Sequence, residues 1–154
     1  MVFAVVRVRG TLNMKPDIKK TLRLLRLTRA NHCTILEENK VYKGMLQMVK
    51  DYTTWGEISK ETLTKLITSR GMLQGDKPIT EEYLKSSTSF KTMETLTHAI
   101  IENKFTYKDI PEVKPLFRLH PPQKGYEGIK RSYQNGGALG YRGKDINKLI
   151  ERML

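Results

Sequence analysis

The chain has 154 residues and one cysteine, and its 28 Lys and Arg against 16 Asp and Glu give a net charge of +12. A single cysteine excludes an intrachain disulfide, and the apolar run at the N-terminus is too short for a secretory signal or a membrane span. This excess of positive charge indicates an anionic partner, of which nucleic acid is the commonest.

The charge is unevenly distributed along the chain. Residues 1–56 carry 11 basic and 4 acidic side chains, a net charge of +7, and residues 113–154 carry 9 and 3, a net charge of +6. The segment between them, residues 57–112, carries 8 and 9, a net charge of −1. This distribution predicts two anion-binding regions joined by a neutral packing segment.

The first predicted element is a strand at residues 2–10, because this stretch is rich in β-branched residues and closes on a glycine. Val6 and Val8 alternate there with Arg7 and Arg9, and successive side chains of a strand point to opposite faces. We therefore expect the valines in a core and the two arginines on the other face, within reach of a polyanion.

A helix is predicted to begin at Pro16, since proline suits the first helical position. Apolar residues at helical spacing form its predicted buried stripe: Ile18, Leu22 and Leu25. Lys19, Arg23 and Arg26 follow the same spacing on another face, where like charges four residues apart oppose helix formation by about 0.2–0.5 kcal/mol per pair. A phosphate alongside would reverse that cost. The alternative interpretation is a solvated basic face.

A second strand is predicted at 31–36, a helix capped by Asn39 at 40–52, and a third strand at 53–58. Gly44 lies inside this helix, where glycine costs up to about 1 kcal/mol relative to alanine. The position indicates close approach of another group, either a neighbouring helix or a nucleic-acid backbone.

These elements predict an α+β fold in three parts. Residues 1–58 form a β-α-β-α-β domain with a three-stranded antiparallel sheet and two helices on one face, like an incomplete ferredoxin-like unit. Residues 59–110 form a small helical subdomain, with helices beginning near Ser59, Thr80 and Thr92. Residues 111–154 form an extended basic tail, rich in glycine and proline and unable to build an ordinary core, that ends in a helix.

The tail interleaves cations and tyrosines with its glycines. Glycine permits close backbone approach, cations neutralise phosphates and tyrosine stacks on bases, so the pattern indicates contact with RNA. The alternative interpretation is a disordered basic tail, against which the next element argues. Apolar residues at helical spacing follow the glycines: Ile146, Leu149, Ile150 and Met153. A terminal amphipathic helix must dock, so we expect the tail to be held at both ends.

Catalytic patterns are missing from the sequence. The histidines His32, His98 and His120 lack metal-ligand spacing, and Asp145 follows Lys144 where a phosphate-binding loop needs Ser or Thr. We therefore predict no enzyme, no cofactor, no small-molecule substrate and no membrane partner. One alternative is a small-ligand or phosphoryl-handling enzyme on a ferredoxin-like core, suggested by Arg9 near Asn13. Another is a DNA-binding protein, which no helix-turn-helix or zinc pattern supports.

Several motifs, in their order and spacing, resemble the large-subunit ribosomal protein family called L-thirty, whose eukaryotic counterpart is called L-seven. The motifs are Val5-Val6-Arg7-Val8-Arg9-Gly10, Asn13-Met14, Asn31-His32-Cys33-Thr34, Tyr42-Lys43-Gly44-Met45-Leu46, Leu119-His120-Pro121-Pro122 and Gly136-Gly137-Ala138-Leu139-Gly140. The resemblance is to the longer, archaeal-type form and covers essentially the whole chain. It implies a structural constituent of the large subunit in the cytoplasmic ribosome, which binds and stabilises folded large-subunit ribosomal RNA beside neighbouring ribosomal proteins. Whether 5S RNA is also touched stays open.

Charge and placement then give two predicted RNA-contact surfaces, whose role is phosphate neutralisation and recognition of RNA shape. The first surface comprises Arg7, Arg9, Thr11, Asn13, Lys19, Arg23, Arg26, Arg29, Lys40, Lys43 and Gly44. The second surface comprises Arg118, His120, Lys124, Lys130, Arg131, Tyr133 and Arg142.

Overall fold

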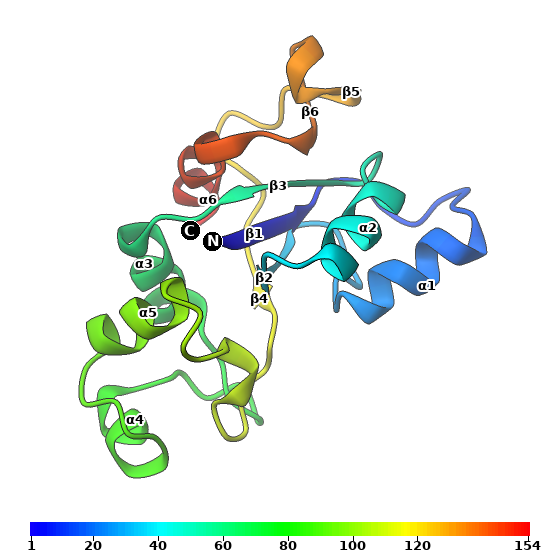
Figure 1. Cartoon of the computed structure of the whole chain (residues 1–154). Coiled ribbons are helices and arrows are strands. Elements are labelled where there is room, and N and C mark those ends of the chain that lie inside the picture. Colours follow the sequence, from blue (N-terminus) through cyan, green and yellow to red (C-terminus); the bar gives the residue numbers. More distant parts are fainter.

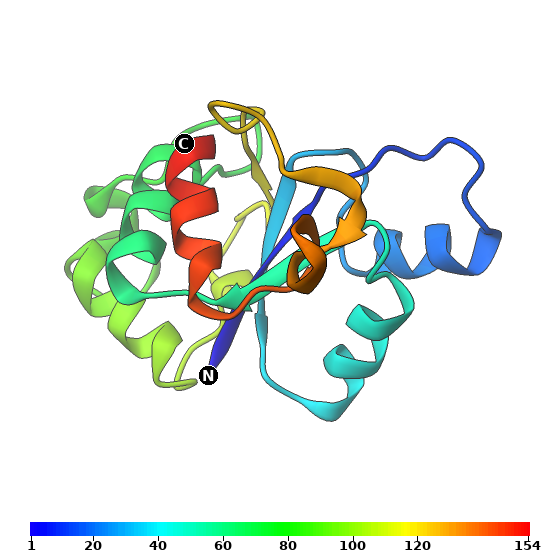
Figure 2. The same ribbon diagram turned by 90° about the horizontal axis from the view of Figure 1, so that it is seen from above.

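A mixed six-stranded sheet with helices on both faces organises the chain in the computed structural model, which describes residues 1–154 (Figure 1, Figure 2). The strands are β1 (Val2–Arg7), β2 (His32–Glu37), β3 (Thr53–Glu57), β4 (Phe117–Arg118), β5 (Gly128–Ser132) and β6 (Gly137–Tyr141). They lie in the order β4-β2-β1-β3-β6-β5. The helices are α1 (Pro16–Leu24), α2 (Lys40–Met48), α3 (Lys60–Arg70), α4 (Glu81–Ser87), α5 (Met93–Ile101) and α6 (Ile146–Met153).

Strand β1 is central and all six of its residues are buried. It pairs antiparallel with β2 on one side and β3 on the other. Phe3 and Val5 pack with Leu22 of α1 and Leu46 of α2. The alternate residues face the other way and pack with residues of α3, α5 and α6, so the strand is covered on both faces.

The largest core cluster draws on all three segments of the sequence. It joins Ala4 from β1, Leu66 from α3, Phe117 from β4 and Ile150 from α6, each at most 1% exposed. Burial of such side chains is the main favourable term in folding, at roughly 25 cal/mol per Å² of apolar surface. Stability of the N-terminal sheet therefore depends on contacts from the rest of the chain.

The predicted α+β class is confirmed, whereas the predicted three strands are wrong because the sheet has six. The additional strands come from the segment predicted to be an extended tail without a core. Strand β4 pairs antiparallel with β2, and β6 pairs parallel with β3. They satisfy backbone groups that a three-stranded sheet would leave open at both edges.

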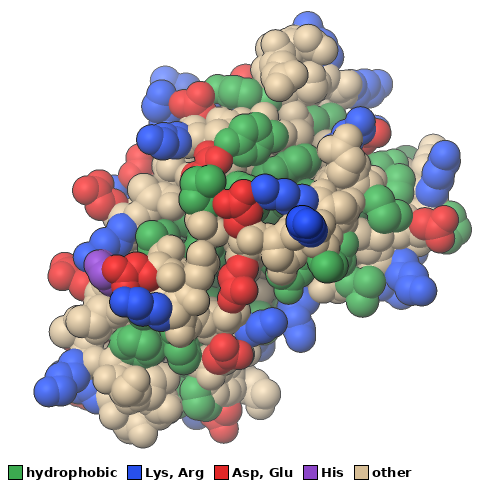
Figure 3. Space-filling model, viewed as in Figure 1, with side chains coloured by type: hydrophobic (Ala, Val, Ile, Leu, Met, Phe, Trp, Pro, Cys, Tyr) green, Lys and Arg blue, Asp and Glu red, His purple; other side chains and the backbone are tan.

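Hydrophobic and basic side chains occupy different parts of the face that contains β3 and β6. Figure 3 shows hydrophobic side chains collected over β3 and β6, with basic side chains along the edges of the same face. No helix is both long and apolar enough to cross a membrane.

Candidate nucleic-acid interface

A basic pocket of about 190 Å³ lies where β1 ends beside α1. Its lining residues are Arg7, Thr11, Lys19, Leu22, Arg23, Leu27 and Thr28. The lining includes three cations and no acidic side chain, and none of the three cations forms an ion pair within the chain. We call these seven residues the basic pocket. An arrangement of this kind attracts an anion.

Arg7 belongs to this pocket but is only 1% exposed. Its Nε donates to the carbonyl oxygen of Arg9 at 2.9 Å and its Nη1 to that of Leu27 at 2.8 Å, while its buried Nη2 has no partner. Burial lowers the pKa of Arg7, although a guanidinium keeps its charge in proteins. The expectation that Arg7 projects to solvent is wrong, because α1 and the residues after it cover this face of the strand.

We call the exposed cations of α1 and of the segment that follows it the rim. Lys19 and Arg23 line the basic pocket itself, whereas Arg26 lines a separate hollow beside β2. Lys19, Arg23, Arg26 and Arg29 are exposed, and none of them forms an ion pair. Arg26 has a left-handed backbone (φ +61°) at the end of α1, where the N–H of Leu27 donates to the carbonyl of Leu22 at 2.8 Å. Glycine is the usual residue in this helix-ending geometry, so an arginine there is strained.

Three other predicted residues lie on loops near the same end of β1. Thr11 and Asn13 are exposed, and Asn13 has a positive φ of +55°. Arg9 is half-buried: its guanidinium lies 5.1 Å from the ring centroid of Tyr52, and it donates to the carbonyl of Asp51 at 3.3 Å. Arg9 is therefore already held against the protein, with part of its side chain accessible.

Helix α2 presents the remaining residues of the first surface. Lys40, Lys43 and Gly44 are exposed, and Lys43 forms an ion pair with Glu38. A Cβ built on Gly44 would meet nothing within 4 Å. Since no neighbouring helix approaches Gly44, packing within this chain does not explain a glycine at this position.

The structure brings Arg118 of the second surface to the first surface. Arg118 lies opposite His32 in the antiparallel pair of β4 and β2, and it forms an ion pair with Asp76 at 3.3 Å. Burial lowers the pKa of His32, and the charges of Arg118, Arg29 and Arg7 lower it further. His32 therefore reports a concentration of positive charge contributed by both surfaces. The sequence does not predict that these charges lie close together, because the pairing of β2 with β4 joins distant parts of the chain.

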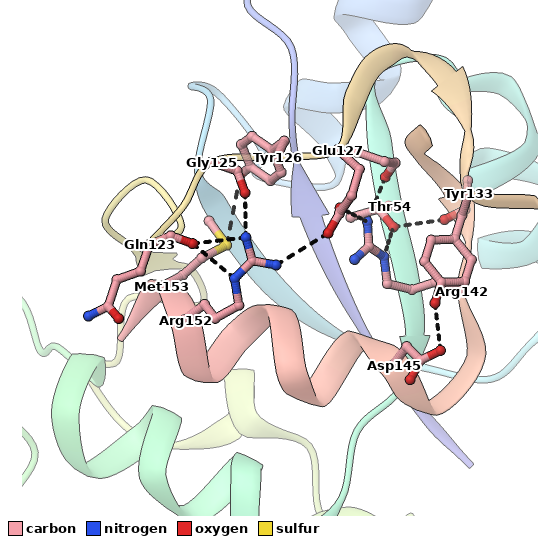
Figure 4. A network of polar contacts seen from close by, with 12 residues as sticks. Thr54, Gln123, Gly125, Tyr126, Glu127, Tyr133, Arg142, Asp145, Arg152 and Met153 are labelled. Carbon is pink, nitrogen blue, oxygen red and sulfur yellow. Dashed lines mark hydrogen bonds and ion pairs between the residues drawn. The ribbon is translucent and has the colours of Figure 1, made fainter. Parts of the chain in front are cut away.

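Arg142 is buried and Tyr133 is half-buried, in contrast to the other residues of the predicted second surface (Figure 4). Arg142 is 6% exposed, and it donates from Nε to the hydroxyl of Thr54 at 2.8 Å and from Nη2 to the carbonyl of Ala138 at 2.9 Å. Its guanidinium lies 4.8 Å from the Tyr133 ring centroid, and the Tyr133 hydroxyl donates to Asp145 at 2.6 Å. The prediction that Arg142 lies on an RNA-contact surface is wrong as to its exposure, because its side chain is hydrogen-bonded to both β6 and β3.

The other residues of the second surface are exposed: His120, Lys124, Lys130 and Arg131. Lys124 has a left-handed backbone (φ +64°) in a loop that Arg152 holds by donating to the carbonyl of Gln123 at 2.8 and 3.0 Å (Figure 4). Arg152 also reaches Glu127 at 3.3 Å. The segment is thus folded against α6, with its cations pointing outward.

An aromatic groove, not predicted from the sequence, lies between α2 and the strands β5 and β6. Its volume is about 340 Å³, and it is lined by Gln47, Lys50, Asp51, Trp55, Lys130, Ser132, Gln134, Leu139, Gly140 and Tyr141. Trp55 and Tyr141 lie opposite each other in the parallel pair of β3 and β6. The sequence predicts the tyrosines of the tail as stacking residues. It does not predict that Trp55 lies beside Tyr141, because the pairing of β3 with β6 joins distant segments.

Neither the basic pocket nor the aromatic groove is lined by a histidine or a cysteine. No group of three or more His, Cys, Asp or Glu side chains is close enough to hold a metal ion. Cys33 is fully buried, and burial raises the pKa of its thiol to about 12, so it is not a thiolate at neutral pH.

Comparisons with known proteins agree in pointing to one family. A profile of the family described as Ribosomal protein L30p/L7e matches residues 3–53. The chain is 52% identical over 151 residues to large ribosomal subunit protein uL30 of Thermoplasma volcanium, covering 98% of this chain and 92% of that protein. It is 48% identical to the proteins of the same name from Methanocorpusculum labreanum and Archaeoglobus fulgidus, with 98% of this chain and 99% of each relative covered.

Proposed function

The chain belongs to the L30p/L7e family of ribosomal proteins, and from that premise we propose that the basic pocket and its rim bind large-subunit ribosomal RNA. The chain is a structural constituent of the large ribosomal subunit in the cytoplasm and not an enzyme. Its partners are ribosomal RNA and neighbouring ribosomal proteins. Because the chain belongs to a family of ribosomal proteins, the alternative of a phosphoryl-handling enzyme is set aside.

The observation that carries the proposal is the unbalanced charge of the basic pocket. Arg7 is a buried cation with no acidic partner, and Lys19 and Arg23 stand above it without ion pairs. A buried charge is costly unless an opposite charge compensates it. A backbone phosphate at the mouth of the pocket would supply that charge, and the hydroxyl of Thr11 could donate a hydrogen bond to its oxygens. The hydroxyl of Thr28 already lies within hydrogen-bond distance of Nδ1 of His32, at 3.3 Å.

The proposed surface extends from the pocket in two directions. Arg29 and Arg118 continue it around His32, and Lys40, Lys43 and Gly44 continue it along α2. Arg26 adds an exposed cation at the end of α1. Because Gly44 has no side chain and no protein neighbour, an RNA backbone could approach α2 closely there. These contacts would position the RNA by its phosphates and its shape.

Predicted residues of the tail take two different roles in this proposal. Lys124, Lys130 and Arg131 are exposed and would contact RNA directly from the folded tail. Arg142 and Tyr133 would act indirectly, by holding that tail in place. We further propose that residues 1–58 and 111–154 are the RNA-binding parts, while residues 59–110 support β1 from the opposite face.

The proposal is tested by measuring affinity for protein-free large-subunit ribosomal RNA over a series of salt concentrations. Each phosphate contact contributes about 0.7–0.9 to the slope of log affinity against log salt. The double variant Lys19→Glu, Arg23→Glu is expected to bind more weakly with a shallower slope. The control Lys85→Glu, Lys91→Glu makes the same charge change on exposed residues of the neutral segment and should leave both quantities unchanged.

An unchanged slope in the Lys19→Glu, Arg23→Glu variant would show that the pocket is not the phosphate site. Thermal unfolding of each variant shows whether the fold is intact. Isolated 5S RNA serves as a second probe in the same assay. Competition by unlabelled 5S RNA would extend the proposal to that molecule, and no competition would restrict it to the large RNA.

A further inference from the structure

The aromatic groove carries an inference beyond phosphate binding. Trp55 and Tyr141 lie side by side on neighbouring strands, and residues opposite each other in a sheet point to the same face. Trp55 packs at the edge of the cluster under α2, while Tyr141 is 45% exposed. Figure 3 shows hydrophobic side chains gathered over these two strands. The pair therefore forms a partly open aromatic floor.

The groove also has hydrogen-bonding groups that the protein leaves free. Gln47, Lys50, Lys130, Ser132 and Gln134 line it, and none of their side chains has a hydrogen-bond partner within the chain. The Tyr141 hydroxyl, in contrast, donates to Glu57, which fixes the orientation of the ring. A fixed aromatic ring beside free amides and ammonium groups suits a planar ligand with a polar edge and a negative charge.

We propose that this groove binds one unstacked base of ribosomal RNA, with its face on Trp55 and Tyr141 and its flanking phosphates near Lys50 and Lys130. The inference rests on the proposed function, since it assumes RNA as the partner. Every base has a π-face that stacks on aromatic side chains, and its edge can bond to amides such as those of Gln47 and Gln134. An apolar protein side chain would instead leave these amides buried without partners.

Trp55 is the only tryptophan of the chain, so the fluorescence of the chain reports the surroundings of this one side chain. The test compares single-stranded RNA hexamers with abasic hexamers of the same phosphate charge. Stacking predicts quenching of Trp55 by the base-bearing RNA and little quenching by the abasic RNA. Equal quenching by both would overturn the proposal, because it would mean that phosphate binding alone is detected.

Variants of Tyr141 separate stacking from the structural role of its hydroxyl. Tyr141→Phe keeps the ring and removes the bond to Glu57, so it should lose less hexamer affinity than a variant without the ring. Tyr141→Leu removes the ring and should lose roughly 5- to 150-fold in affinity, the range that corresponds to one stacked base. Equal affinities of Tyr141→Leu and wild type would contradict the proposal.

The same fluorescence measurement in the complex with large-subunit ribosomal RNA distinguishes the two proposals. If the RNA binds but Trp55 emission stays unchanged, the groove proposal fails and the proposed function stands. If wild type binds no ribosomal RNA, the proposed function fails. A change in Trp55 emission that appears only when neighbouring ribosomal proteins are added would assign the groove to a protein and overturn the base-binding proposal.

Discussion

The Nε of Arg142 donates to the hydroxyl oxygen of Thr54 at 2.8 Å, and this buried contact joins β6 to β3. Nη2 of the same guanidinium donates to the carbonyl of Ala138 at 2.9 Å. Arg142, which is predicted from its charge to contact RNA, thus holds the tail against the N-terminal sheet.

Replacing Arg142 by methionine is therefore expected to lower the free energy of unfolding by about 1–3 kcal/mol, since buried polar groups lose their partners. Urea denaturation measures this change. The control Arg131→Met removes an exposed arginine from the same segment and should change the free energy of unfolding by less than about 0.5 kcal/mol. Equal effects of the two substitutions would contradict the assigned role of Arg142.

Gly44→Ala is expected to separate stability from binding. Alanine raises helix propensity and meets nothing within 4 Å, so the free energy of unfolding should rise by up to about 1 kcal/mol. Affinity for ribosomal RNA should fall, because a methyl group would obstruct the backbone at α2. Ser69→Ala, at an exposed position on α3, is the control that should add stability without affecting affinity. Wild-type RNA affinity in the Gly44→Ala variant would show that RNA does not approach α2 closely at Gly44.

Arg26→Gly, like Gly44→Ala, should raise the free energy of unfolding and lower the affinity for ribosomal RNA, but the physical reason differs. Glycine relieves the left-handed strain at φ +61°, while its greater freedom in the unfolded chain offsets part of the gain, which leaves a net stabilisation below about 1 kcal/mol. Loss of the arginine should weaken RNA binding and reduce its salt dependence by about one phosphate contact. The measurements are denaturation and a salt series.

Asn103→Gly is the matched control for Arg26→Gly. Asn103 has φ +56° after α5, and the N–H of Lys104 donates to the carbonyl of Ala99 at 3.0 Å in the same helix-ending geometry. This substitution lies in the neutral segment and should leave RNA affinity unchanged. If both variants bind RNA as wild type does, the arginine at position 26 serves no RNA contact.

His32 gives a prediction about pH. Burial and three nearby arginines hold its pKa below the usual value of about 6.5. Between the two pKa values the unfolded chain binds more protons than the folded chain, so stability rises with pH there and is lost as pH falls below about 6.5. Acid denaturation of His32→Gln should therefore start at lower pH than that of wild type. The same onset in both would show that His32 does not cause the loss.

Much of the first 58 residues can be predicted from sequence, because their signals are local. Val2–Arg7 alternates between two packed faces, and Asn39 caps α2 by accepting from the N–H of Tyr42 at 2.7 Å. The position of Arg7 cannot be predicted in this way. Its burial depends on where the chain after α1 crosses the strand, which is a tertiary property.

The tail is less predictable because its strands depend on distant partners. Strand β6 contains two glycines and has little intrinsic strand preference, yet it pairs with β3. The nearby contact needs a glycine in β3, since a Cβ at Gly56 would lie 1.8 Å from the carbonyl oxygen of Gly143. The tail glycines are predicted from composition to let RNA approach closely, whereas at this contact the approaching backbone belongs to the chain itself and the required glycine lies in β3.

The central claim is that the chain is held in the large ribosomal subunit through its basic pocket. The most direct measurement is gradient sedimentation of tagged chains expressed in an archaeal relative. Wild type and the Lys85→Glu, Lys91→Glu control should sediment with large subunits, while Lys19→Glu, Arg23→Glu should shift toward the top of the gradient. Sedimentation of that double variant with large subunits at the wild-type level, or wild type remaining at the top, would contradict the claim.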